Sequence, residues 1–304
     1  MNEAPEITWP FVSVIVPVYN DCEHIELLLK SLLCQDYPKD LLEIIVIDNN
    51  STDTSKEIVQ KFPVTLLEEN DIQSSYAARN RGIRHAKGQI LVFIDSDCVA
   101  DSQWLRQGIT KLCTKSVDLV GGQAKFTFSE KQTAAECYDS LANLALESKV
   151  SRGVAATCNL FVKTEVFKSI GLFPDNVKSG GDVQWTGKAT QAGFSLVYAP
   201  NAVVYHPARF LGELLKKLYR VSVGMGGILI SEQSPKSQIL LKVFGKLKPY
   251  SISFVKQLIA EKGSDNMNEK LISIWFVAHL CRFVMALGLS RALFRKAPKT
   301  TQTN

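Results

Sequence analysis

The 304-residue sequence lacks several features that would place it in a common class of proteins. It contains no internal repeat and no low-complexity linker, which argues against a solenoid or a disordered chain. Its seven cysteines are odd in number and lack the paired spacing of zinc sites, so reduced thiols are expected. Residues 1–10 lack the basic and then apolar pattern of a signal peptide. These absences favour a folded protein of the cytoplasm.

The positive charge of the chain is unevenly distributed. The formal net charge is +5, and lysines and arginines crowd the last third of the sequence. No helix-turn-helix, zinc-finger or aromatic RNA-binding signature accompanies them, so nucleic acid is not the expected partner. A phosphate-bearing substrate or an anionic membrane fits this charge better.

The first hundred residues alternate between short apolar runs and helical stretches. The runs, rich in β-branched residues, are 11–18, 44–47 and 90–94. The stretches between them are 23–34, 54–62 and 75–86. Alternation of this kind predicts an α/β fold with buried, parallel strands at the centre of the sheet. Because open α/β sheets bind ligands beyond the carboxyl ends of their strands, the polar turns there mark the expected site.

The pattern changes after Asp101, which indicates a second half of different topology. We expect a helix through Cys113, a short strand at 119–122 and one long helix over 133–150. Further helices are expected at 165–170 and 182–193, and the sheet is expected to continue through a strand at 196–199. From about residue 208 the chain is typical of basic, apolar helices.

Two aspartates two residues apart follow the strand at 90–94. If the extended geometry persists, the carboxylates of Asp95 and Asp97 point to the same side and offer hard oxygen donors to Mg²⁺ or Mn²⁺. The alternative is an ordinary acidic turn that caps the helix beginning near Ser102. Asp48 ends another strand in the same way and can accept a hydrogen bond from a base or ribose, whereas Asp53 is expected to cap the next helix.

These elements together resemble family 2 glycosyltransferases of the GT-A fold. The resemblance lies in Val-Ile-Val-Pro-Val-Tyr-Asn (14–20), Ile-Asp-Asn-Asn-Ser-Thr-Asp (47–53), Ala-Ala-Arg-Asn-Arg-Gly (77–82) and Phe-Ile-Asp-Ser-Asp (93–97). It continues in Cys-Asn-Leu-Phe-Val (158–162), Ile-Gly-Leu-Phe-Pro (170–174), Gly-Gly-Asp (180–182) and Val-Val-Tyr-His (203–206). It implies a Rossmann-like mixed sheet flanked by helices.

The resemblance also implies a role for particular residues at a nucleotide-sugar donor. Pro17 and Tyr19 would line the base pocket, unless they only pack at the strand end, and Asp48 would bind the base. Arg79 or Asn80 would face the nucleotide and its phosphates. Asn159 would lie at the donor-sugar or acceptor edge, or else make backbone hydrogen bonds.

The metal site implied by the resemblance centres on the cluster Asp95, Ser96 and Asp97. Asp97 would be the direct ligand of Mn²⁺ or Mg²⁺, and Asp95 would contact the ribose or sugar side and border the metal. His206 would complete the metal or diphosphate site, since imidazole suits Mn²⁺. Lys216, Lys217 and Arg220 would neutralise the departing diphosphate; their alternative is a solvated or membrane-facing surface.

Asp182 would be the catalytic base of an inverting transfer. In the family, an aspartate here takes a proton from the acceptor hydroxyl as that oxygen attacks the anomeric carbon. The usual preceding glutamate is replaced by Gly181, which puts the acceptor contacts in doubt. Processive synthases of the family carry a Gln-x-x-Arg-Trp motif that this sequence lacks, so transfer of a single sugar is favoured.

The C-terminal third contains an apolar segment at 271–289 with His279 and Arg282 near its middle. An arginine at the centre of a spanning helix costs about 2.5 to 3.5 kcal/mol, so a helix lying in the membrane interface fits better than a span. His279, Arg282, Ala286 and Ser290 form a narrow polar stripe on this helix. The alternative is a helical pair packed on the catalytic domain or on a second copy, giving a homodimer.

The expected organisation is a tail at 1–10, a GT-A catalytic domain at 11–225, a basic and apolar helical extension at 226–296 and a disordered tail at 297–304. We expect transfer of a sugar from a nucleotide diphosphate, by family preference UDP, to a hydroxyl of a glycan or lipid-linked acceptor in cell-surface polysaccharide or glycolipid synthesis. The enzyme would be peripheral at the inner face of the plasma membrane.

Two other functions are alternatives to this one. A sugar nucleotidyltransferase would need a glycine-rich, lysine-bearing loop after the first strand, and residues 18–21 supply none. A non-catalytic nucleotide-sugar-binding membrane scaffold would not need both Asp97 and Asp182.

Overall fold

The computed structural model describes residues 9–114, 117–143, 145–175, 177–231 and 233–294. The chain divides into two units. Unit 1 contains Met1–Thr127, Ala145–Asn176 and Gly181–Pro207, and unit 2 contains Phe128–Leu144, Val177–Gly180 and Ala208–Asn304. This division falls at residue 207, whereas the sequence predicted a boundary at 225. Most of the predicted N-terminal tail and all of the predicted C-terminal tail lie outside the described residues.

Unit 1 is built on one mixed sheet of eight strands. Their order is β3-β2-β1-β4-β7-β6-β8-β5. The strands are β1 (Val12–Val18), β2 (Leu42–Asp48), β3 (Thr65–Glu68), β4 (Ile90–Ile94), β5 (Val99–Ala100), β6 (Leu119–Thr127), β7 (Asn159–Lys163) and β8 (Leu196–Pro207). The block β3-β2-β1-β4 is parallel, and β7 runs antiparallel between β4 and β6. The predicted mixed α/β sheet is confirmed.

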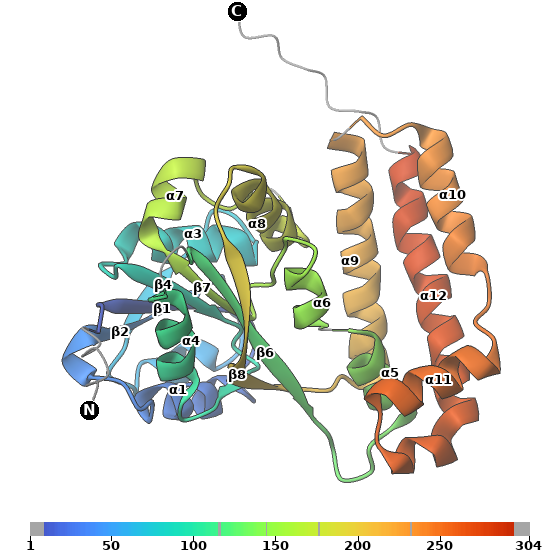
Figure 1. The fold of residues 1–304 in the computed structure, drawn as a ribbon, viewed down its shortest axis with the longest axis horizontal. Helices are drawn as coiled ribbons and strands as arrows, with labels where there is room; N and C mark the ends of the chain where they lie inside the picture. The colour runs from blue at the N-terminus through green and yellow to red at the C-terminus, as the bar shows by residue number, and fades with distance from the viewer. Residues whose placement is uncertain (1–8, 115–116, 144, 176, 232, 295–304) are drawn as a thin grey trace, which may run out of the picture. The chain divides into compact units, whose positions relative to one another are not determined.

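The central strands are apolar because helices cover both faces of the sheet (Figure 1). Every residue of β1 and of β4 is buried, as expected for β-branched and aromatic runs at the centre of a parallel sheet. The helices of unit 1 are α1 (Ile25–Leu33), the 3-10 helix η1 (Lys39–Leu41), α2 (Ser55–Val59), α3 (Ser75–His85), α4 (Trp104–Leu112), α6 (Leu146–Val150), α7 (Thr164–Ile170) and α8 (Gly181–Gln191).

Helix α3 lies unusually close to the sheet, and a glycine allows it. A Cβ added at Gly82 would come within 2.7 Å of Ile47 Cδ1 and 2.8 Å of Ile15 Cγ2, both in neighbouring strands. Any larger side chain would therefore push α3 away from β1 and β2. This contact fixes the helix that carries the Ala-Ala-Arg-Asn motif against the carboxyl ends of the central strands.

The structure corrects some predicted boundaries. The single long helix expected over 133–150 is two helices, α5 (Ala134–Ala142) in unit 2 and α6 in unit 1. The break follows Asn143, whose backbone is extended and whose amide nitrogen donates to Asp139 Oδ1 over 2.7 Å. The strands predicted at 119–122 and 196–199 extend much further, because β6 and β8 pair in parallel along nine positions.

Unit 2 is helical. Besides α5 it contains α9 (Leu211–Ser231), α10 (Lys236–Leu247), α11 (Ile252–Lys262), the 3-10 helix η2 (Asp265–Lys270) and α12 (Leu271–Phe294). Helix α12 lies alongside α9 and α10 (Figure 1). Its inward side chains, including Ile274, Ala278 and Cys281, join a buried cluster with α5, α9 and α11.

Three residues of the polar stripe predicted on α12 make contacts within unit 2 or are buried. The Arg282 guanidinium donates to the Gly245 carbonyl at the end of α10 and lies 4.1 Å from the centroid of the Tyr250 ring. His279 Nδ1 bonds the Trp275 carbonyl within the same helix, and Ala286 is buried. Unit 2 therefore supplies a carbonyl and an aromatic ring as partners for the charge at the centre of α12.

Candidate active site

Three of the predicted acidic residues lie at the carboxyl ends of β2 and β4, the two strands that flank β1 in the parallel block of the sheet. Asp48 is the last residue of β2, and Asp95 and Asp97 directly follow β4. The side chains of Asp95 and Asp97 are 35% and 25% exposed, and Ser96 between them is also half-buried. A pair of carboxylates that is held yet still open to solvent is suited to binding an external cation or a polar ligand.

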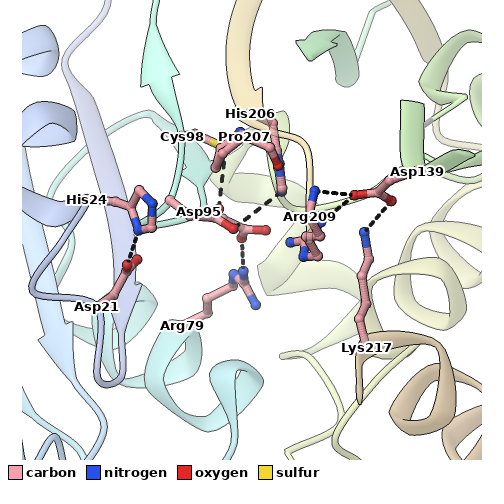
Figure 2. Close-up of polar contacts among 11 residues, drawn as sticks. Asp21, His24, Arg79, Asp95, Cys98, Asp139, His206, Pro207, Arg209 and Lys217 are labelled. Carbon is pink, nitrogen blue, oxygen red and sulfur yellow. Dashed lines mark hydrogen bonds and ion pairs between the residues drawn. The ribbon is translucent and has the colours of Figure 1, made fainter. Parts of the chain in front are cut away.

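Asp95 is held by a buried arginine of α3 (Figure 2). Arg79 Nη2 lies 2.5 Å from Asp95 Oδ1, and the arginine side chain is only 4% exposed. Its Nη1 donates to the Ser75 carbonyl, while Nε is buried and finds no hydrogen-bond partner in the described part of the chain. Arg79 thus anchors one oxygen of Asp95 and brings positive charge to the carboxyl end of β4.

Asp97 lies close to His206, which stands near the end of β8. His206 Nε2 lies 3.4 Å from Asp97 Oδ2, and the imidazole is 1% exposed. Its Nδ1 lies 2.7 Å from the Pro207 carbonyl, a contact that requires a proton on Nδ1. In the neutral ring Nε2 then presents a lone pair toward the carboxylate, an arrangement that a cation between the two groups stabilises.

Cys98 completes a group of three metal-binding side chains that the sequence analysis did not single out. Ligand atoms of Asp97, Cys98 and His206 all lie within 4.8 Å of one another. Burial, together with the nearby carboxylates of Asp97 and Asp95, raises the pKa of the Cys98 thiol well above its usual range. A thiol that stays protonated is a poor ligand, so the oxygen and imidazole donors are the better metal site.

Asp48 carries a buried oxygen with an unmet hydrogen-bonding capacity. The side chain is almost fully buried, and Oδ2 accepts from the Ser51 amide over 3.1 Å. Oδ1 is buried and has no hydrogen-bond partner among the residues that the structure describes. An ionised carboxylate oxygen in this position is costly unless a donor reaches it, which is what the N–H of a base or a ribose hydroxyl provides.

Two loops next to Asp48 are tied together by hydrogen bonds. Asn20 Oδ1 accepts from the Thr52 amide over 2.7 Å, and Ser51 Oγ accepts from the Asn20 amide over 3.0 Å. Asn20 has φ 49°, in the left-handed region that asparagine tolerates. Just before this loop Pro17 is buried in β1, whereas the Tyr19 ring is 52% exposed and accessible to a flat ligand.

The predicted base Asp182 lies in the first turn of α8 and is half-buried. Its Oδ1 accepts from the Tyr76 hydroxyl and from the Val183 amide, each over 2.9 Å. Its Oδ2 accepts from the Thr157 amide over 3.2 Å. Tyr76 was not among the residues predicted from the sequence, although it stands directly before the Ala-Ala-Arg-Asn motif.

Two of the predicted ligand residues make structural hydrogen bonds. Asn80 uses both polar atoms on the backbone of Phe173, at 2.8 and 3.0 Å, and its role at a nucleotide stays a prediction. Asn159 is fully buried; its amide donates to the carbonyls of Gln123 and Ala202, and its oxygen accepts from Trp104. The alternative of backbone hydrogen bonds is therefore the one found for Asn159.

The basic residues of α9 divide into two kinds. Lys216 and Arg220 are exposed and share one face of the helix, so their role at a diphosphate stays a prediction. Lys217 lies 3.8 Å from Asp139, a fully buried carboxylate of α5 that Arg209 also approaches (Figure 2). Lys217 therefore takes part in an ion-pair cluster within unit 2.

The chain is similar in sequence to a known protein family and to known proteins. Residues 13–152 match the model of the family described as Glycosyl transferase family 2. The chain is 40% identical over 290 residues to Glycosyltransferase AglE of Haloferax volcanii, covering 92% of this chain and 95% of that protein. It is 27% identical over 220 residues to the poly(ribitol-phosphate) beta-N-acetylglucosaminyltransferase TarS of Staphylococcus aureus, covering 68% of this chain but 37% of TarS.

Solved structures share the fold at low sequence identity. The mannosyltransferase PcManGT from Pyrobaculum calidifontis, in complex with GDP-Man and Mn²⁺, superposes with a TM-score of 0.60 at 22% identity, over 96% of this chain and 78% of that one. Residues 1–349 of S. aureus TarS in complex with UDP superpose with a TM-score of 0.54 at 19% identity, over 94% and 93%.

Proposed function

Because the chain belongs to glycosyltransferase family 2, with a GT-A fold and nucleotide-sugar donors, we propose that it transfers a single sugar, with inversion, to a hydroxyl group of a glycan or lipid-linked acceptor. The observation that carries this proposal is the meeting of Asp97 and His206, 3.4 Å apart, where Asp97 follows β4 and His206 lies at the end of β8. The donor is expected to carry UDP or GDP, as in the complexes of TarS and PcManGT.

The donor set fits a divalent cation of the Mn²⁺ or Mg²⁺ type. Asp97 offers carboxylate oxygens, and His206 presents Nε2 toward them because its Nδ1 is bonded to Pro207. An oxygen and imidazole pair suits Mn²⁺ better than Mg²⁺, which prefers oxygen alone. A cation held by Asp97 and His206 would supply positive charge against the diphosphate of the donor.

The side chains around this pair have distinct roles in the proposed reaction. Asp48 accepts a hydrogen bond from the base or ribose at its buried Oδ1, and the exposed Tyr19 ring offers a face for the base. Arg79 holds Asp95 in place and adds positive charge near the phosphates. These contacts orient the donor before the chemical step.

Asp182 carries the proton transfer. Its Oδ1 already accepts two hydrogen bonds, whereas Oδ2 accepts one, so Oδ2 retains a lone-pair site for the acceptor hydroxyl. The hydroxyl proton moves to Asp182 as its oxygen bonds the anomeric carbon from the face opposite the diphosphate. The bond between that carbon and the diphosphate oxygen breaks, and the nucleoside diphosphate departs with the electron pair.

Nucleotide binding and donor hydrolysis test the proposal together. UDP or GDP with Mn²⁺ should raise the melting temperature of the protein, and EDTA should remove the increase. A matching sugar donor, screened among UDP-glucose, UDP-GlcNAc and GDP-mannose, should be hydrolysed slowly. Asp182→Asn should keep nucleotide binding and lower kcat by about 10²- to 10⁴-fold.

Each other outcome of these measurements has a clear meaning. No stabilisation by any nucleoside diphosphate would refute the site. Tight binding without turnover, for every donor and for simple hydroxyl acceptors, would instead favour a non-catalytic nucleotide-sugar binder.

For the membrane, we propose that the exposed face of α12 lies against an anionic leaflet. Large apolar side chains spaced three or four residues apart form one exposed stripe along the helix, namely Ile272, Phe276, Leu280, Phe283 and Leu287. The segment Asn266–Phe294 is long and apolar enough to cross a membrane by length and composition. Lys236, Lys242 and Lys248 of the neighbouring α10 segment are exposed and would face anionic lipid headgroups.

Vesicle sedimentation tests this second part. Phe276→Ser with Phe283→Ser should weaken binding to anionic vesicles by about tenfold for each phenylalanine removed. Leu27→Ser, which changes an equally exposed apolar residue of α1, should not. A wild-type dimer in solution that the two phenylalanine substitutions dissociate, without vesicle binding, would show that a second copy covers this face instead.

A further inference from the structure

Helix α3 connects the proposed base to the aspartate cluster after β4. Tyr76 and Arg79 stand three residues apart on this helix and so share one of its faces. The Tyr76 hydroxyl donates to Asp182 Oδ1 over 2.9 Å, and Arg79 Nη2 contacts Asp95 Oδ1 over 2.5 Å. The Arg79 guanidinium also lies 5.6 Å from the centroid of the Tyr76 ring.

Tyr76 is buried and packed, so that its hydroxyl can hold the Asp182 carboxylate in one position. Its side chain is 5% exposed, and its ring lies 6.0 Å from that of Phe173, whose backbone is bonded to Asn80 on the same helix. Burial, with the nearby Asp182 carboxylate as a further cause, raises the pKa of the Tyr76 hydroxyl. The hydroxyl therefore stays protonated and remains a donor throughout the neutral range.

The hydrogen bonds of Asp182 are divided unequally between its two oxygens. Two of the three donors are backbone amides, Val183 on Oδ1 and Thr157 on Oδ2. Among the side chains that the structure describes, Tyr76 is the donor to this carboxylate. With Tyr76 and Val183 on Oδ1, the rotation of the carboxylate is fixed and Oδ2 is the oxygen left for the acceptor.

We infer that Tyr76 is a positioning residue for Asp182, and that α3, through Tyr76 and Arg79, sets the separation between the proposed base and Asp95. This inference rests on the proposed function, because it takes Asp182 as the base. It assigns to the tyrosine a role in orientation, with no direct contact to either substrate. A purely structural tyrosine would affect folding and leave the chemical step unchanged in the folded protein.

Tyr76→Phe tests the inference, because it removes the hydroxyl and keeps the buried ring. Hydrolysis of UDP-glucose, UDP-GlcNAc and GDP-mannose would be measured with Mn²⁺. We expect kcat to fall about 10- to 100-fold, the effect of losing a hydrogen bond to a charged group, while KM for the donor stays within about twofold. Tyr37→Phe is the matched control: Tyr37 is also 5% exposed, and its hydroxyl donates to the Pro10 carbonyl over 2.6 Å.

A double variant separates positioning from a structural effect. In the Asp182→Asn background, adding Tyr76→Phe should lower kcat no further, since the two residues act through one group. The inference would be overturned by an equal further decrease in that background, by a wild-type kcat in Tyr76→Phe, or by a comparable loss in Tyr37→Phe.

Amide exchange decides the matter if the wild type hydrolyses none of the three donors. An absence of hydrolysis would count against the proposed function but not against the positioning role of Tyr76. Loosening of the Asp182 carboxylate should still speed hydrogen–deuterium exchange at the Thr157 and Val183 amides in Tyr76→Phe, and Tyr37→Phe should show no such change. Unchanged exchange at both amides would refute the positioning role whatever the reaction is.

Discussion

The two units of this chain place a carboxylate beside basic side chains in opposite ways. In unit 1, Asp97 remains 25% exposed and faces the His206 imidazole across 3.4 Å. In unit 2, Asp139 is fully buried; it accepts from the Arg209 amide and from Asn143, and the Arg209 and Lys217 side chains lie within 4 Å.

The difference separates binding from stability. A carboxylate that is enclosed and bonded on both oxygens holds its neighbours together, and removing it leaves buried cations without compensation. A carboxylate that stays open costs less to remove and is available to an external ligand. Asp97 should therefore matter for activity and Asp139 for folding, although both are aspartates beside basic side chains.

The largest expected effect is that of Asp97→Ala on activity. Removing the proposed metal ligand should lower Mn²⁺-dependent donor hydrolysis by about 10³-fold, because a bound cation contributes several kcal/mol to stabilising the transition state. The melting temperature without metal should change little. The opposite result would be an Asp97→Ala variant that is largely unfolded but whose folded fraction hydrolyses the donor at the wild-type rate. It would mean that Asp97 serves folding and not activity.

The next effect is that of Asp139→Asn on stability. It should lower the free energy of unfolding by about 3 kcal/mol, because the cations of Arg209 and Lys217 lose their buried counter-charge. Urea denaturation followed by circular dichroism measures it. Glu269→Gln, which neutralises an exposed carboxylate of unit 2, should change the value by less than about 0.5 kcal/mol. If Asp139→Asn and Glu269→Gln had the same free energy of unfolding, burial of the carboxylate would not decide its contribution to stability.

The smallest effect concerns Asp53, a half-buried carboxylate between these extremes. Burial on its own raises the pKa of Asp53, but hydrogen bonds from Ser55 and from Cys22 outweigh it and lower the pKa from 3.8 to about 2. A carboxylate with a depressed pKa in the folded state stabilises the fold above its unfolded pKa and loses that contribution as the pH falls through the folded value.

Asp53→Asn should therefore cost about 1 kcal/mol of unfolding free energy near neutral pH, as for the loss of a helix cap. The gap to the wild type should shrink as the pH falls from 3.8 toward about 2, and denaturant midpoints measured across that range would show it. A gap that is independent of pH would mean that the Asp53 charge does not contribute.

Part of the site could be predicted because it depends on local pattern. Asp48 ends one strand and Asp95 follows another, and the apolar runs of both strands are long enough to be recognised. Both strands pair in parallel with β1, so their carboxyl ends lie at one edge of the sheet. The ordered motifs added His206, which is more than 100 residues away from Asp97 in the chain and lies beside it in the fold.

Other features could not be predicted because they depend on which atoms a side chain contacts in the folded protein. The sequence does not show whether the amide of an asparagine in a motif bonds a ligand or a backbone carbonyl. The amides of Asn80 and Asn159 bond backbone carbonyls. The helix over 133–150 shows no proline or glycine at its break, so local propensity favours continuation, and the split between the two units decides otherwise. The helical spacing likewise places Arg282 on one face of α12 but does not show which helices pack against that face.

The sequence by itself determined the family, the α/β class and the strand-end aspartates, because burial of β-branched runs and the chemistry of carboxylates are legible along the chain. Only the tertiary structure decided which oxygens are open and which are already bonded. It encloses Asp139, leaves Asp48 Oδ1 with no hydrogen-bond partner among the described residues, and brings the Tyr76 hydroxyl to Asp182. Hydrogen bonds require atoms within about 3 Å, and residues far apart in the sequence reach that distance only when the sheet and its helices pack.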